Sequence, residues 1–262
     1  MAEKRKVQAA IASQECLTDG IYSMWLQFPA DYNMAAMAKA GQFVSLYSGD
    51  GSRLLPRPIS ICEIDAEGAK LRLVYRVAGA GTEEFSRMQP GESIEVIGPL
   101  GNGFTQREGQ AILIGGGIGI PPMLQLSKSL SEQGAEVQVV LGYRDNDLFL
   151  QSEFEKYGSV SVSTEDGSAG TKGNVIDAIQ AERLTADAVY ACGPIPMLRG
   201  VKAYAAEHHI PAQISMEERM ACGIGACLAC VCQSKDVDGH SNVHNKRVCK
   251  DGPVFDAEEI EL

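Results

Sequence analysis

The first hundred residues alternate short apolar runs with polar turns. The runs are rich in β-branched and aromatic residues, and turn segments such as SGDGS, DAEG and QPGE separate them. This pattern predicts the short strands of a small antiparallel barrel. The predicted strands lie at residues 7–13, 21–29, 41–48, 58–65, 70–77 and 93–100, with a short helix at 80–88 crossing one end.

The pattern changes near residue 110. A continuous apolar run at 111–115 is typical of a strand buried on both faces of a parallel sheet. The helix predicted after it begins with proline and ends with glycine, as helices prefer. Strands then alternate with helices, which predicts a doubly wound parallel sheet. The strands are predicted at 137–143, 159–166, 187–194 and 211–218, and the helices at 121–134, 175–184 and 197–210.

These patterns divide the chain into three predicted parts. An antiparallel barrel occupies residues 1–104, an α/β domain occupies 105–215, and a C-terminal segment occupies 216–262. The last segment has few periodic apolar positions, so we expect it to need a bound centre to hold its shape.

Charge and composition exclude some classes of partner. The 262 residues carry a formal net charge of −11, which argues against binding nucleic acid or an anionic membrane, because both require a basic surface. The first residues are charged and lack the apolar run of a signal peptide, and no apolar stretch is long enough to span a membrane. We therefore expect a cytoplasmic protein with reduced thiols, which disfavours disulfides.

Two glycine-containing turns follow buried strands of the predicted sheet. Residues 115–117 lie between a strand and a helix, where a pyrophosphate can approach the backbone and the helix N-terminus. The spacing fits G-x-G-x-x-G only in part, so a plain structural turn remains an alternative. Residues 192–194 repeat the layout, although Cys192 alone reads as a small buried core residue. Both turns are expected at the edge where such sheets bind ligands. The candidate nucleotide-binding residues are Gly115, Gly116, Gly117, Cys192, Gly193 and Pro194.

Acidic residues after the next strands bear on the choice of nucleotide. Asp145 and Asp147 follow one strand, and Glu165 and Asp166 follow another. Carboxylates bond ribose hydroxyls and repel a 2′-phosphate, which favours NADH over NADPH. Arg144 is the one residue here that argues the other way.

The stretch LLPRPISI, residues 54–61, lies between predicted barrel strands. Its arginine, proline and serine suit a clamp for a phosphate and a flavin edge, although an edge-strand proline beside a surface arginine is the simpler interpretation. The order of the motifs favours the flavin interpretation, because R-P-x-S is followed by VYRVAGAGT and then by a nucleotide fold with a C-G-P turn. Over about residues 5–215 this order resembles the ferredoxin–NADP reductase superfamily.

That resemblance implies FAD in the barrel and a nicotinamide cofactor in the second domain. The residues that it implies for FAD lie along the R-P-x-S motif, along the VYR strand and at the start of the following helix. They are Arg57, Pro58, Ile59, Ser60, Val74, Tyr75, Arg76, Gly81 and Thr82.

Four cysteines of the C-terminal segment have the spacing of a plant-type [2Fe–2S] site, C-x4-C-x2-C with a distant fourth thiol. They are Cys222, Cys227, Cys230 and Cys249. A zinc site built from Cys227, Cys230, His240 and His244 competes, but its central loop is shorter than the usual ~12 residues and it leaves two cysteines unused. Cys232 is expected to pack beside the site.

Taken together, the three parts resemble the electron-transfer subunits of the class 1B, NAD-dependent dihydroorotate dehydrogenases, most closely in MEERMACGIGACLACVC and VCKDGPVF. The resemblance implies a cytoplasmic oxidoreductase subunit of pyrimidine biosynthesis. It would pass electrons from the FMN of a catalytic partner through a [2Fe–2S] cluster and FAD to NAD+, in a heterotetramer of two plus two subunits with the cluster at the subunit interface. The dihydroorotate site is expected on the partner, because this chain has no eight-fold βα pattern, and no catalytic residue is assigned here.

Two alternatives remain open from the sequence. A related reductase with the same centres would serve a hydrogenase, a sulfur reductase or a glutamate synthase. A nucleotide-binding regulator that holds zinc would be colourless and without turnover.

Overall fold

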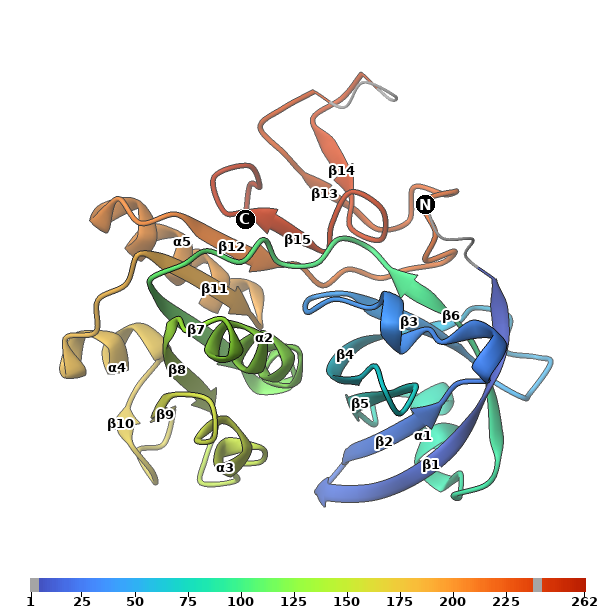
Figure 1. Cartoon of the computed structure of the whole chain (residues 1–262). Coiled ribbons are helices and arrows are strands. Elements are labelled where there is room, and N and C mark those ends of the chain that lie inside the picture. The colour runs from blue at the N-terminus through green and yellow to red at the C-terminus, as the bar shows by residue number, and fades with distance from the viewer. Residues whose placement is uncertain (1–4, 238–241) are drawn as a thin grey trace.

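The computed structural model describes residues 5–237 and 242–262. Its N-terminal part is a closed antiparallel barrel with the strand order β1-β2-β5-β4-β3-β6, as predicted (Figure 1). Strand β1 runs further than expected because its pairing with β2 continues through two irregularities in register. The strands are β1 (Lys6–Thr18), β2 (Ile21–Gln27), β3 (Phe43–Tyr47), β4 (Arg57–Asp65), β5 (Lys70–Arg76) and β6 (Ser93–Leu100).

The barrel interior is filled by alternate side chains of its strands. Val44 and Leu46 of β3 and Leu71 and Leu73 of β5 are fully buried there. The helix α1 (Ala80–Arg87) covers one end and adds Phe85 to the same core. Two short 3₁₀ turns, η1 (Ala30–Tyr32) and η2 (Ala35–Met37), connect β2 to β3.

The second part is a sheet with the order β10-β9-β8-β7-β11-β12-β15. All its pairings are parallel except that of β15 with β12, so the predicted doubly wound sheet is confirmed. Its strands are β7 (Gln110–Gly116), β8 (Glu136–Tyr143), β9 (Ser159–Thr164), β10 (Thr171–Lys172), β11 (Ala188–Cys192), β12 (Ala212–Ser215) and β15 (Val254–Asp256). Its helices are η3 (Gly117–Gly119), α2 (Pro121–Glu132), α3 (Gln151–Phe154), α4 (Val175–Glu182) and α5 (Ile195–His208).

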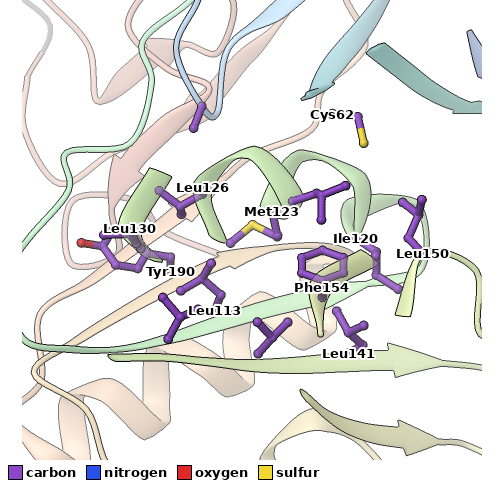
Figure 2. Packing of buried hydrophobic residues seen from close by; sticks show 14 of the residues in the cluster. Cys62, Leu113, Ile120, Met123, Leu126, Leu130, Leu141, Leu150, Phe154 and Tyr190 are labelled. Carbon is purple, nitrogen blue, oxygen red and sulfur yellow. The ribbon is translucent and has the colours of Figure 1, made fainter. Parts of the chain in front are cut away.

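Helices cover both faces of this sheet. Leu113 of β7 packs with α2 and α3 on one face, whereas Ile112 and Ile114 pack with α4 and α5 on the other. Figure 2 shows Met123 and Leu126 of α2 directed at the sheet. This alternation explains the continuous apolar run of β7, because neighbouring side chains serve opposite layers.

The first apolar layer also joins the two parts of the chain. Cys62 of β4 belongs to the same buried cluster, on the barrel side of α2 (Figure 2). The Ile64 amide donates a hydrogen bond of 2.7 Å to Gln125 of α2. Arg72 of β5 forms an ion pair with Glu153 of α3 at 2.5 Å. The barrel and the sheet are therefore held together by apolar, hydrogen-bonding and ionic contacts.

The C-terminal segment lies over the junction of the two parts (Figure 1). It contains a small hairpin, β13 (Val231–Gln233) and β14 (Asn245–Arg247), and then β15. Because β15 joins the large sheet beside β12, residues 254–256 belong structurally to the second part rather than to a separate third unit. The described residues contain no helix that is long and apolar enough to cross a membrane.

Candidate redox site

Four cysteines of the C-terminal segment lie in two pairs. The Sγ atoms of Cys222 and Cys227 are 3.3 Å apart in the irregular loop before β13. In the second pair, the Cys249 amide points at Cys230 Sγ from 3.4 Å. Two pairs of thiols match the need of a [2Fe–2S] cluster, whose irons each take two cysteine ligands.

The hairpin explains how Cys230 meets Cys249 across 19 positions of sequence. In the β13–β14 register Val231 pairs with Arg247, so the residue before β13 lies beside the residues that follow β14. The Val248 amide bonds the Cys230 carbonyl at 2.8 Å and continues this pairing. Both cysteines are about 1% exposed.

The first pair is held in a tight loop that favours thiolate. Burial opposes ionisation of Cys222, but backbone N–H groups of Ile224, Cys227 and Ala226 point at its sulfur, and together they lower the pKa of the thiol to about 6. Gly223 and Gly225 have φ values of +68° and +84°, which only glycine adopts readily. The loop therefore presents amide hydrogens to sulfur, as a negatively charged cluster requires.

The second pair and the fifth thiol are in more apolar surroundings. Burial, together with the neighbouring Cys230, raises the pKa of Cys249 to about 12. Burial and the charge of Glu218 raise the pKa of Cys232 to about 11. Cys232 Sγ faces the Lys246 carbonyl at 3.6 Å, so this thiol packs within the hairpin and belongs to neither pair.

Arg247 ties the loop of the first pair to the turn that carries Cys249. Its guanidinium donates to the Gly225 carbonyl at 3.2 Å and to Asp251 at 3.1 Å. A methyl group on Gly225 would lie 2.6 Å from the Lys250 side chain, so the loop also packs closely on this turn. The two thiol pairs are thus fixed relative to each other.

The competing zinc site finds no matching geometry. Within residues 5–237 and 242–262, no three His, Cys, Asp or Glu side chains converge as a single metal ion requires. The His244 ring nitrogen Nδ1 lies 2.8 Å from the Lys235 carbonyl. His240, the other histidine of that hypothesis, is outside the described residues.

The R-P-x-S motif lies along β4, and its four residues are half-buried. Arg57 crosses to α1, where its Nε would lie 2.6 Å from a Cβ built on Gly81. The Thr82 hydroxyl accepts the Ala78 amide at 2.9 Å and orders the start of the helix. An arginine over a helix N-terminus suits the pyrophosphate of FAD. Ile59, by contrast, packs against the barrel core.

The VYR strand places its three side chains differently. Val74 is buried in the layer shared with α2, and Arg76 lies near the glycine turn, with Nη2 4.0 Å from a Cβ built on Gly117. The Tyr75 side chain is only 2% exposed within the barrel core and stacks on Tyr22, with ring centroids 6.1 Å apart. Alternation along the strand turns Tyr75 inward, so only its main chain is available to a flavin.

The two glycine turns of the sheet meet. A Cβ on Gly119 would lie 2.3 Å from the Cys192 carbonyl oxygen, and one on Gly116 would lie 3.2 Å from Pro194. Part of the glycine content therefore serves close packing of the chain on itself. Burial raises the pKa of the Cys192 thiol to about 12, which fits a neutral packed residue.

The carboxylates that favour NADH lie on the same edge. Arg144 is 85% exposed at its side chain and pairs with Asp145 at 3.7 Å. Asp147 accepts a hydrogen bond from Thr18 of the barrel. The backbone hydrogen bond from Asp166 to the Arg144 carbonyl brings the two acidic segments together.

Two family models match this chain. Residues 217–261 match the iron–sulfur cluster binding domain of dihydroorotate dehydrogenase B, and residues 113–203 match the oxidoreductase NAD-binding domain. The protein named dihydroorotate dehydrogenase B (NAD(+)), electron transfer subunit, from Geobacillus kaustophilus is 42% identical over 96% of this chain and 97% of its own length. The chain belongs to this family of electron-transfer subunits. The protein of the same name from Enterococcus faecalis is 43% identical over 99% of this chain and 100% of its own length.

Solved structures share the fold of this chain. A structure of an NADH-dependent reduced ferredoxin-NADP oxidoreductase matches with a TM-score of 0.85 and 30% identity, over 97% of this chain and 89% of the other. A ferredoxin NADP+ reductase from Neisseria gonorrhoeae shares the fold, with a TM-score of 0.63 and 17% identity over 78% of this chain and 92% of the other. The predicted family, fold and cofactors, FAD, [2Fe–2S] and NAD(H), are confirmed, and the protein is an NAD-linked flavin and iron–sulfur oxidoreductase subunit.

Sequence reasoning did not find every residue of the site. Arg247 and Asp251 read as ordinary surface charges. Only the hairpin register brings them to the loop that carries Cys222 and Cys227.

Proposed function

We propose that this subunit passes electrons between a catalytic partner, which oxidises dihydroorotate to orotate on its own FMN, and NAD+, by way of a [2Fe–2S] cluster and FAD. The observation that carries the proposal is that one chain holds two thiol pairs, an arginine beside the helix that follows the R-P-x-S motif, and two glycine turns that meet. The family to which the chain belongs supports the choice of partner.

The ligand assignment follows the two thiol pairs. Cys222 and Cys227 would hold one iron, and Cys230 and Cys249 the other. When bound, FAD exchanges either two electrons with the nicotinamide or one with the cluster, which is why it belongs between them.

The remaining residues bind and orient. Arg57 and the N-terminus of α1 would hold the FAD pyrophosphate, with Pro58 and Ser60 beside the flavin. The turns at 115–117 and 192–194 would hold the nicotinamide nucleotide at the carboxyl edge of the sheet. Arg76 of β5 reaches toward Gly117, so the two binding regions adjoin.

We place the partner over the loop of the first thiol pair. Ile224 and Leu228 of this loop are 51% and 57% exposed, and large apolar side chains on a cluster loop suit burial in a subunit interface. A heterotetramer of two such subunits with two catalytic ones is the assembly we expect. None of the eight cysteines, all of which are described, forms a disulfide, which is compatible with the cytoplasmic location that we propose.

A second candidate keeps the same centres with another redox partner. The similarity to the NADH-dependent reduced ferredoxin-NADP oxidoreductase, at 30% identity, is the observation that favours it. Co-expression with the dihydroorotate-oxidising subunit separates the two. A stable complex that reduces NAD+ with dihydroorotate supports our proposal, and failure to form any complex with an intact cluster and FAD present contradicts it.

Cysteine variants test the ligands directly. Cys222→Ser, Cys227→Ser, Cys230→Ser and Cys249→Ser should each lose the cluster, whereas the control Cys232→Ser should keep two irons per chain. Iron analysis and visible absorption of anaerobically purified protein measure this. Full iron in any of the first four variants would remove that residue from the ligand set.

A further inference from the structure

Three buried serine hydroxyls have no hydrogen-bond partner within the described residues: Ser45, Ser127 and Ser163. Ser45 is 1% exposed and lies on β3 of the barrel. The buried Ser23 of β2, elsewhere on the barrel, shows the usual arrangement, because its hydroxyl accepts the Arg72 Nε–H at 2.9 Å. A buried hydroxyl without a partner is unfavourable, so an unsatisfied one at a functional site calls for an acceptor.

The Ser45 hydroxyl faces the loop of the first thiol pair. A Cβ built on Gly223 would lie 2.7 Å from Ser45 Oγ and 3.8 Å from Leu100 of β6. Gly223 directly follows Cys222. Any side chain at position 223 would therefore displace the hydroxyl, and the loop rests on the barrel at this serine.

Ser45 also lies beside β4, the strand that carries the R-P-x-S motif. Ser45 is opposite Pro58 in the β3–β4 register, and Phe43 is opposite Ser60. Alternation sends Val44 and Leu46 into the barrel core, so Ser45 lies on the outer face. Ser45 thus lies between β4, which carries the R-P-x-S motif, and the loop that carries Cys222 and Cys227.

We propose that the Ser45 hydroxyl donates a hydrogen bond to a cysteine or inorganic sulfur of the cluster at its Cys222 corner, and so raises the reduction potential of the cluster. The proposal rests on the function and ligands proposed above. Hydrogen bonds to cluster sulfurs set such potentials, because the reduced cluster carries one more negative charge and gains more from the donor. Ser45 acts here as a positioning and tuning residue.

The test compares Ser45→Ala with Ser127→Ala in the full complex with its partner subunit. Ser127 is a matched control, since its hydroxyl is equally buried and unpartnered but lies on α2. Iron and FAD content are measured first, and a redox titration then follows the cluster by its electron paramagnetic resonance signal and FAD by absorbance.

We expect Ser45→Ala to keep its iron and FAD and to lower the cluster potential. A charge-assisted hydrogen bond is worth on the order of a tenfold change in equilibrium, which is about 59 mV for a one-electron couple. The FAD potential should stay unchanged, Ser127→Ala should change neither potential, and Ser45→Thr, which keeps a hydroxyl, should recover the wild-type value. Iron loss in Ser45→Ala that Ser45→Thr repairs would also support the proposal.

Three results would overturn it. An unchanged cluster potential in Ser45→Ala would show that no hydrogen bond to the cluster is made. A shift of the FAD potential alone would assign the hydroxyl to the flavin. Iron loss in both Ser45→Ala and Ser45→Thr would show that Ser45 acts only by packing against the cysteine loop. A wild-type complex without iron would instead contradict the proposed function itself, so the two failures are distinguishable.

Discussion

Replacing Arg72 with methionine should weaken the junction between the barrel and the nucleotide domain. Arg72 is only 5% exposed, yet its guanidinium forms charge-assisted hydrogen bonds to carboxylates of both domains. Glu63 of β4 accepts Nη1 at 2.7 Å, and Glu153 of α3 accepts Nη1 and Nη2 at 2.5 and 3.0 Å. Methionine keeps much of the volume but removes every donor.

The magnitude follows from what the substitution leaves behind. Removing one partner of a buried ion pair typically costs about 3–5 kcal/mol, because the other charge stays buried and unpaired. Here the carboxylates of Glu63 and Glu153 are 16% and 26% exposed, so water reaches them in part. We therefore expect Arg72→Met to lower the free energy of unfolding by about 2–3 kcal/mol, below the range for fully buried pairs.

The assay is urea unfolding of Arg72→Met, Glu63→Gln and Glu153→Gln, each loaded with FAD. Glu63→Gln is the matched control, because Glu63 and Arg72 belong to the same domain, whereas Glu153 pairs with Arg72 across the junction. Both single carboxamides should lower stability less than Arg72→Met. Of the two carboxamides, only Glu153→Gln should also slow reduction of the flavin by NADH in stopped-flow measurements, because only Glu153 pairs with Arg72 across the junction. An Arg72→Met protein within about 0.5 kcal/mol of wild type, the usual effect of a surface substitution, would refute this reasoning.

Three further predictions concern α1, the arginine of the R-P-x-S motif and the glycine turn of the sheet. Burial opposes ionisation of Glu84 of α1, but hydrogen bonds from Ser48 and Gly49 and the ion pair with Arg53 hold the pKa of its carboxyl below the ordinary value of 4.5. The ionised carboxylate therefore stabilises the fold at neutral pH, and this contribution is lost as pH falls below that value. The difference in unfolding free energy between wild type and Glu84→Gln, under about 1 kcal/mol at neutral pH, should vanish in unfolding curves recorded in acid. Arg57→Ala should release FAD on gel filtration, whereas Arg87→Ala, at the exposed far end of α1, should retain it. If both variants kept the same amount of FAD, the proposal that Arg57 holds the FAD pyrophosphate would be wrong. Gly119→Ala should lower the thermal midpoint and NADH affinity, because its methyl group would lie 2.3 Å from a backbone oxygen of β11, while Gly51→Ala, with open space around it, should change neither.

Much of the fold was predictable because its signals are local. The alternation at 93–100 coincides with β6, since every second side chain faces the barrel core. The apolar run of β7 and the proline-to-glycine span of α2 carry equally direct signals of a buried strand and a helix. The C-x4-C-x2-C spacing is equally local, and the Sγ atoms of its first two cysteines, Cys222 and Cys227, lie 3.3 Å apart in one loop.

What the sequence did not reveal depends on contacts between distant segments. The β13–β14 hairpin has only three residues in each strand, too few for a periodic pattern, and β15 becomes a sheet strand only through its pairing with β12. Tyr75 turned out to face the barrel core because the strand register, which the motif alone does not define, decides which side chains point outward. Short α3 matters chiefly because it carries Glu153 to Arg72.

These long-range contacts also explain how the cluster, FAD and nicotinamide sites are kept at constant distances from one another. The cysteine segment is attached to the barrel where Gly223 meets Ser45, and again where the Asn102 amide bonds the Gly252 carbonyl at 2.6 Å. It is attached to the large sheet by β15. Electron transfer between two centres depends on the distance between them. Because the cysteine segment is attached to both domains, the distances from the cluster to the other two sites stay constant only while the two domains keep their relative position. The Arg72 ion pair across the junction therefore acts on all three sites at once, so loosening it should slow reduction of the flavin and of the cluster together.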